Sequence, residues 1–201
     1  MVTLDELRAR VAADYAPLGL PSWPDPHPGG AAPREEEYSR LTEPMRYRIL
    51  RRRVELWAAR IAELPGVVAE AVDDGVRLTS PRPGTLPLVL LGRDVPLPHV
   101  EIAVVRPSIA ITTQPDCGCD ACDTGSADLL STVDDAIGTV IGGPFVALVG
   151  PGWLATWHPE GAAASNVDLR WAVGVSRRLA DGQQVRLPAG ASAFVGRSWL
   201  D

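Results

Sequence analysis

A helical repeat that stops abruptly at Pro65-Gly66 constrains the fold of this chain more than any other feature of its sequence. Between residues 44 and 64, apolar side chains recur every three or four residues, which is the spacing of one helix face. Thr42 is placed to cap this helix, and Pro44 falls in its first turn, where a missing N–H costs nothing. The sequence therefore predicts a long amphipathic helix over 44–64, whose apolar stripe comprises Tyr47, Leu50, Val54, Trp57, Ile61 and Leu64.

After this helix the apolar period changes to two, which is typical of strands. Asp73-Asp74-Gly75 has the composition of a hairpin turn between strands at 67–72 and 76–79. A second helix is expected over 126–140, with Ser126 as its cap. Hairpins that follow one another favour an α+β fold, in which both helices pack on a mostly antiparallel sheet. The remaining strands are predicted at 86–91, 100–105, 109–113, 145–149, 153–158, 169–175, 185–187 and 193–195.

The first 37 residues divide into a helix and a proline-rich arm. Thr3 and Glu6 have the spacing of a capping box, which predicts an N-terminal helix within residues 1–16. Residues 17–37 contain six prolines, and a pyrrolidine ring fixes φ and removes an amide donor, so this arm must be extended. We expect Trp23 to anchor the arm to an α+β core at 38–201, all within a single domain.

Composition excludes several classes of function. The net charge of −6 and the pI near 5.1 argue against a nucleic-acid-binding protein. All 19 basic residues are arginine, so chemistry that needs a lysine amine, such as Schiff-base formation, is excluded. The N-terminus lacks the pattern of a signal peptide, and no apolar run approaches the ~18 residues of a membrane span. We expect a cytoplasmic protein with reduced cysteines.

All three cysteines lie in one short loop, Cys117-Gly118-Cys119-Asp120-Ala121-Cys122-Asp123, between a predicted strand and a predicted helix. Thiolates are ligands that zinc favours, and this spacing allows Cys117, Cys119 and Cys122 to surround one ion. The fourth ligand would be a histidine, for which we favour His158, or an aspartate such as Asp120 or Asp123. The aspartates around the loop would also leave it strongly negative without a cation.

Two other interpretations of the loop stay open. Cys119 and Cys122 form a C-x-x-C motif just before a helix, where amide dipoles lower the pKa of a thiol and favour redox chemistry. The neighbouring aspartates oppose that effect. In the third interpretation, the three residues are reduced thiols that serve only as small packing side chains.

Other polar and aromatic groups are interpreted as structural. We expect the arginine-rich faces of the 44–64 helix to be solvated, with an anion-binding patch as the alternative. Asp134-Asp135 is likewise expected to lie on a solvated helix face. Trp153 and Trp157 share one face of a predicted strand, which indicates core packing or, alternatively, an aromatic pocket.

The cysteine loop resembles that of a family of actinobacterial proteins of unknown function, which carry the same seven residues before a helix. The similarity extends to Tyr38-Ser39-Arg40 and Pro44-Met45-Arg46-Tyr47, and to Gly152-Trp153 and Ser198-Trp199. It therefore spans most of the chain. The resemblance implies no activity, cofactor or site residue, because none is assigned to the family.

The sequence lacks the motifs of α/β-hydrolases, zinc metalloproteases, dinucleotide-binding enzymes and P-loop NTPases. We therefore expect a non-enzymatic cytoplasmic binding or structural module with a protein or small-molecule partner. Its cysteine loop holds a zinc ion or is simply packed. The alternatives are an enzyme that uses a metal or a thiol of the 117–122 loop, and a small-ligand-binding domain with a tryptophan-lined pocket.

Overall fold

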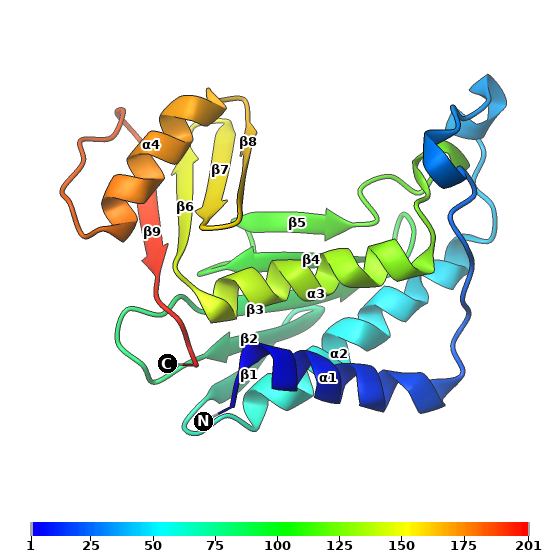
Figure 1. The fold of residues 1–201 in the computed structure, drawn as a ribbon, viewed down its shortest axis with the longest axis horizontal. Helices are drawn as coiled ribbons and strands as arrows, with labels where there is room; N and C mark the ends of the chain where they lie inside the picture. Colours follow the sequence, from blue (N-terminus) through cyan, green and yellow to red (C-terminus); the bar gives the residue numbers. More distant parts are fainter. Residues whose placement is uncertain (1, 201) are drawn as a thin grey trace.

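Three helices cover one face of a five-stranded antiparallel sheet in the computed structural model, which describes residues 2–200 (Figure 1). These helices are α1 (Leu4–Tyr15), α2 (Arg48–Ala62) and α3 (Ser126–Gly142), and a fourth helix, α4 (Leu169–Ala180), lies against a second sheet. The five-stranded sheet runs in the order of the chain through β1 (Val68–Val72), β2 (Gly75–Thr79), β3 (Leu88–Arg93), β4 (His99–Val104) and β5 (Ala110–Gln114). The predicted α+β class with antiparallel hairpins is confirmed.

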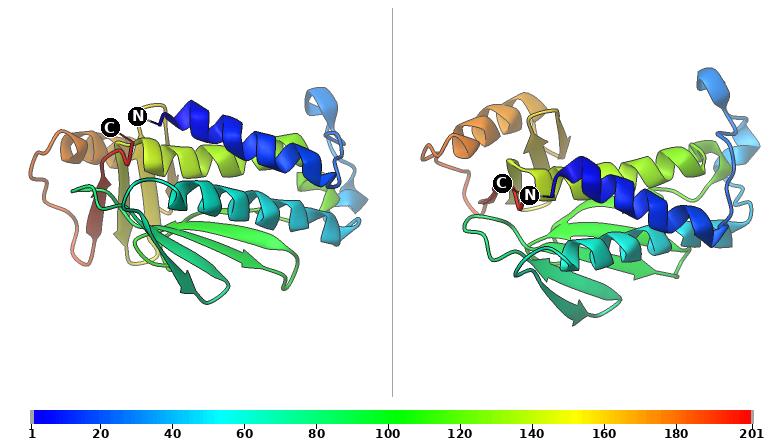
Figure 2. Two further views of the ribbon diagram at one scale, coloured as in Figure 1. Left: turned by 90° about the horizontal axis from the view of Figure 1, so that it is seen from below. Right: turned by 60° about the horizontal axis from the view of Figure 1, so that its bottom comes forward.

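The helices form two layers over this sheet (Figure 2). Helices α2 and α3 contact the strands directly, and α1 lies across α2 and α3. The helix predicted over 44–64 is confirmed for Arg48–Ala62, whereas Pro44–Tyr47 form a 3-10 turn before it. The stripe residues within α2, Leu50, Val54, Trp57 and Ile61, are buried, and Trp57 is fully so. The capping box of Thr3 and Glu6 begins α1 as predicted. Within residues 2–200, no helix combines the length and the apolar character of a membrane span.

A second sheet, which the sequence analysis did not separate from the first, stands at one end of this assembly (Figure 1). It consists of β6 (Phe145–Gly150), β7 (Trp153–His158), β8 (Gly161–Ser165) and β9 (Ser192–Gly196), in the order β8-β7-β6-β9. Helix α4 packs against β6 and β7. Trp153 of β7 meets Trp171 of α4 edge to face, with ring centroids 5.8 Å apart, so these tryptophans form core contacts.

The predicted strand at 169–175 is wrong, because these residues begin α4. Alternating apolar residues suggested period two, but the buried side chains Ala172, Val175 and Ser176 follow the helical period. Asp168 caps the helix by accepting a hydrogen bond from the amide of Trp171 at 2.7 Å.

Two smaller differences also concern the second sheet. Residues 185–187 form no strand, although Val185 and Leu187 pack against the core formed by β6, β7 and α4. Strand β8 was not predicted, because its alanines carry little strand propensity.

An ion pair between α2 and α3 holds the two inner helices together. Arg53, which is 7% exposed, donates from Nε and Nη2 to the two oxygens of Asp134 at 2.8 and 2.6 Å. Trp57 Nε1 donates to the same carboxylate at 2.6 Å. The expectation of a solvated face is therefore wrong for Asp134 and Arg53. Each residue neutralises the charge of the other, which offsets the free-energy cost of removing these charges from water. Asp135, the next residue, does face solvent and pairs with Arg8.

This difference between adjacent aspartates gives a matched test. We expect Asp134→Ala to lower the free energy of unfolding by about 3–5 kcal/mol, because it leaves the Arg53 charge buried without a partner. Asp135→Ala, which removes an exposed ion pair from the same helix, should change it by less than about 1 kcal/mol. Urea unfolding followed by circular dichroism measures both, and equal effects would contradict the assigned role of Asp134.

Candidate functional site

The cysteine loop connects the edge strand β5 to helix α3, as predicted. A single 3-10 turn, Asp120–Cys122, lies at its centre. The helix that follows begins at Ser126, but Ser126 is not its side-chain cap, because the hydroxyl donates to the backbone carbonyl of Trp23 at 3.0 Å. The loop is therefore tied to the N-terminal arm before α3 begins.

The three sulfur atoms converge on one point. The Sγ atoms of Cys117, Cys119 and Cys122 all lie within 4.8 Å of one another. Cys117 and Cys119 are closest, with 3.1 Å between their sulfurs, and the amide of Cys119 points to the Cys117 sulfur at 3.4 Å. All three are free thiols; Cys117 and Cys122 are exposed and Cys119 is partly buried.

The thiols have different proton affinities. A hydrogen bond from the Cys117 side chain lowers the pKa of Cys119 below its ordinary value. The hydrogen bond with Cys119 raises the pKa of Cys122 to about 12. The pKa values of Cys119 and Cys122 move in opposite directions because the three thiols lie close together. Once one of them is a thiolate, its negative charge disfavours a second thiolate beside it.

The carboxylate of Asp120 binds two residues that follow the arm, Arg40 and Thr42. Its oxygens accept hydrogen bonds from Arg40 Nε, from the amide of Thr42 at 2.8 Å and from the Thr42 hydroxyl at 2.6 Å. Burial alone would raise the pKa of Asp120, but the hydrogen bonds from Arg40 and Thr42 outweigh it and lower the pKa to about 2. The predicted role of Thr42 as the cap of the 44–64 helix is wrong, because its hydroxyl is used here.

Asp123 makes a second and more buried contact with the arm. Both of its oxygens accept from Trp23 Nε1, at 3.0 and 2.9 Å, and one also accepts from Arg46 Nη2. The Arg46 guanidinium lies over the Trp23 ring, 4.7 Å from its centroid, and Trp23 stands edge to face against Tyr47. The expectation that Trp23 anchors the arm is confirmed by these contacts.

These contacts neutralise the negative charge of the cysteine loop without a metal ion. The loop aspartates were expected to need a cation, yet Asp120 and Asp123 are neutralised by Arg40 and Arg46. Their oxygens are occupied by hydrogen bonds and do not join the sulfur cluster. The structure therefore brings together three of the predicted ligands and neither candidate aspartate.

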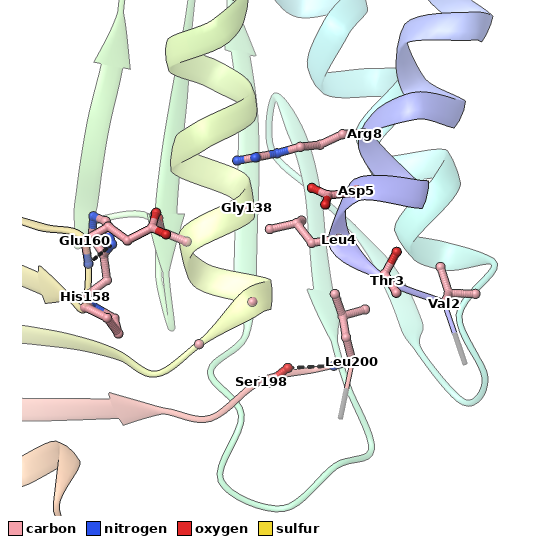
Figure 3. A pocket seen from close by; sticks show the side chains of 14 residues that line it. Val2, Thr3, Leu4, Asp5, Arg8, Gly138, His158, Glu160, Ser198 and Leu200 are labelled. Carbon is pink, nitrogen blue, oxygen red and sulfur yellow. Dashed lines mark hydrogen bonds between the residues drawn. The ribbon is translucent and has the colours of Figure 1, made fainter.

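The histidines lie elsewhere. His158, at the end of β7, lines a cavity beside Gly138 and Gly142, in the C-terminal half of α3 (Figure 3). A 17-residue helix is about 25 Å long, and the cysteines precede its other end, so His158 does not reach them. His27 lies 3.1 Å from Glu37, and His99 Nδ1 lies 2.8 Å from the carbonyl oxygen of Leu97. Within residues 2–200, only the three cysteines form a cluster of ligand atoms.

Sequence reasoning missed the residues that hold the loop. Arg40 and Arg46 were assigned to no site, although they lie in the segments 38–40 and 44–47, to which the family resemblance extends. Glu37 extends the network, because its carboxylate accepts from Arg40 Nη2 at 3.2 Å. No spacing rule links these residues to the loop, which follows them by about 80 residues.

Comparison with known proteins gives one match. The sequence model of a family of unknown function (DUF6226) matches residues 11–201. No curated protein and no solved structure matches the chain.

Glu37 makes the stability of this network dependent on pH. Hydrogen bonds from the amide of Arg34 and from His27 lower the pKa of Glu37 from 4.5 to about 2. A carboxyl whose pKa is lower in the folded state stabilises that state above its unfolded pKa, and the stabilisation is lost as the pH falls through the folded pKa. We expect Glu37→Gln to destabilise the protein above pH 4.5, and the difference from the parent to shrink toward zero near pH 2. Urea midpoints across this range measure it. Glu36→Gln, at an exposed neighbour, should show little difference at any pH.

Proposed function

The chain belongs to this family of unknown function, and we propose that it is a non-enzymatic binding module whose cysteine loop holds a thiophilic metal ion, with zinc as the preferred ion. Cys117, Cys119 and Cys122 supply three thiolate ligands. The observation that carries the proposal is the convergence of their sulfur atoms within 4.8 Å.

The spacing of the sulfurs suits zinc. Zinc binds thiolates at about 2.3 Å in a tetrahedron, which places two sulfurs about 3.8 Å apart. The Cys117 and Cys119 sulfurs, now 3.1 Å apart, would need to separate only slightly, and the loop that carries them is held at Asp120 and Asp123. Thiolates also bind zinc by releasing protons, which removes the competition for one negative charge among the three thiols.

The fourth coordination position would be filled from outside the cluster. No His, Asp or Glu of residues 2–200 joins the three cysteines, and Cys117 and Cys122 face solvent. Water or a donor group of a binding partner would complete the tetrahedron. A zinc ion with three protein ligands can also be catalytic. Here the two carboxylates within the loop, Asp120 and Asp123, are bound to arginines, and this occupation disfavours a role as general base and favours binding over catalysis.

The proposal is tested by metal content. Protein purified without chelator or affinity metal should carry about one zinc ion per chain and show a thiolate-to-metal absorption band after replacement by cobalt. Cys119→Ser should lose the metal and the band. His158→Ala should keep both, since His158 lies at the far end of α3.

Two results would contradict the proposal. One is a metal content below ~0.2 per chain in parent protein that also fails to take up added zinc, because thiolate sites bind zinc tightly. The other is a Cys119→Ser variant that retains the metal. Recovery of the parent protein with a Cys119–Cys122 disulfide and no metal affinity would favour the redox interpretation instead.

A further inference from the structure

Three adjoining cavities form a groove between the two sheets. The first, of 470 Å³, begins at Asp116 beside the cysteine loop and lies between β5 and β8. The second, of 320 Å³, shares Ile111, Thr156 and Ala163 with the first. The third, of 520 Å³, shares His158 with the second and ends at the N-terminus of α1. A continuous path therefore runs from the cysteine loop to the other end of α3.

The groove exposes the edges of two strands. Successive side chains of a strand point to opposite faces of its sheet. A cavity that touches four successive residues therefore meets both faces of the strand, as a cavity along the strand edge does. The first cavity touches residues 111–114 of β5 in this way, and the first two together touch residues 162–165 of β8. Both strands are the last in their sheets, so one edge of each has no partner strand.

Neither edge is protected in the usual way. Exposed edge strands normally carry a charged side chain or a proline that prevents another strand from pairing with them. Strand β5 has the sequence Ala-Ile-Thr-Thr-Gln and β8 has Gly-Ala-Ala-Ala-Ser, with no charge and no proline in either. The small side chains of β8 also leave room for the side chains of an added strand.

The charges along the groove select the kind of partner. Its lining includes four carboxylates and one guanidinium, that of Arg8, which is already paired with Asp135 at 2.8 Å. Figure 3 shows the far end, where Glu160 and His158 line one wall and Asp5 and Arg8 of α1 line the other. The carboxylates are those of Asp5, Asp116, Asp135 and Glu160.

We propose that this groove binds an extended, basic peptide segment of a partner protein, which adds a strand to the free edge of β5. Main-chain hydrogen bonds to β5 would supply much of the affinity, as in other cases of strand addition. Small side chains of the peptide would face the alanines of β8, and arginine or lysine side chains would reach Asp116 and Glu160. The inference does not depend on metal binding by the cysteines.

Fluorescence anisotropy with three labelled octapeptides tests the proposal. The probe alternates arginine and alanine, the second peptide replaces arginine with glutamate, and the third replaces alanine with proline. We expect the probe to bind and the other two to bind at least about tenfold more weakly. Glutamate reverses the charge, and proline removes amide donors and cannot extend a sheet.

Ala163→Arg is the matching change in the protein. Ala163 is exposed and lines two of the three cavities, so an arginine there fills the groove and repels the probe without disturbing the core. It should weaken binding at least about tenfold. Ala71→Arg is the control, because Ala71 is an exposed alanine of β1, the edge strand on the other side of the five-stranded sheet.

Three outcomes would overturn the proposal. Binding of the proline peptide as tight as that of the probe would mean that charge alone is recognised. Equal binding to Ala163→Arg and the parent would place the site elsewhere. Absence of binding by all three peptides would show that the groove does not accept a basic strand.

Discussion

The structure depends on carboxylates with little solvent exposure that find their cationic or N–H partners on distant parts of the chain. Asp134 of α3 is held by Arg53 and Trp57 of α2, and Asp123 of the cysteine loop is held by Trp23 and Arg46. A carboxylate taken out of water without such partners would cost several kcal/mol. Each pair therefore permits one arrangement of its two elements, whereas apolar contacts alone would tolerate several.

The same constraint explains why the cysteine loop has a defined shape although it is exposed. Two aspartates flank Cys122: Asp120 binds Thr42, just after the arm, and Asp123 binds Trp23 of the arm. These contacts fix the backbone between the two aspartates. The thiols are left on the opposite side, directed at one another. The arm thus acts as a support for the loop, and the aspartates that suggested a cation by their charge serve as its attachment points.

The second sheet gives the molecule its other functional surface. Helix α3 spans the distance between the cysteine loop and the cavity at His158, and β6 begins directly after it. Because β6 starts a new sheet, β5 is left as an edge (Figure 1). The groove therefore exists because the chain forms two separate sheets, each with a free edge strand. Neither edge strand carries the charge or proline that normally prevents another strand from pairing with it.

The sequence by itself determined the elements whose signals are local. The stripe of α2, the capping box of α1, the Asp-Gly hairpin and the clustering of the cysteines all involve residues close together in the chain, and each appears in the structure as predicted. Local signals failed at 169–175, where the apolar residues fit both the strand period and the helical period. They also failed in β8, because alanine has little strand propensity. The tertiary structure alone decided that Asp134 pairs with Arg53 and that Arg40 and Arg46 hold the loop. It also decided that His158 lies away from the cysteines and that the strands divide into two sheets. These facts concern pairs of residues far apart in the chain, and the free energy that selects them comes from burial and charge pairing, which no local pattern records.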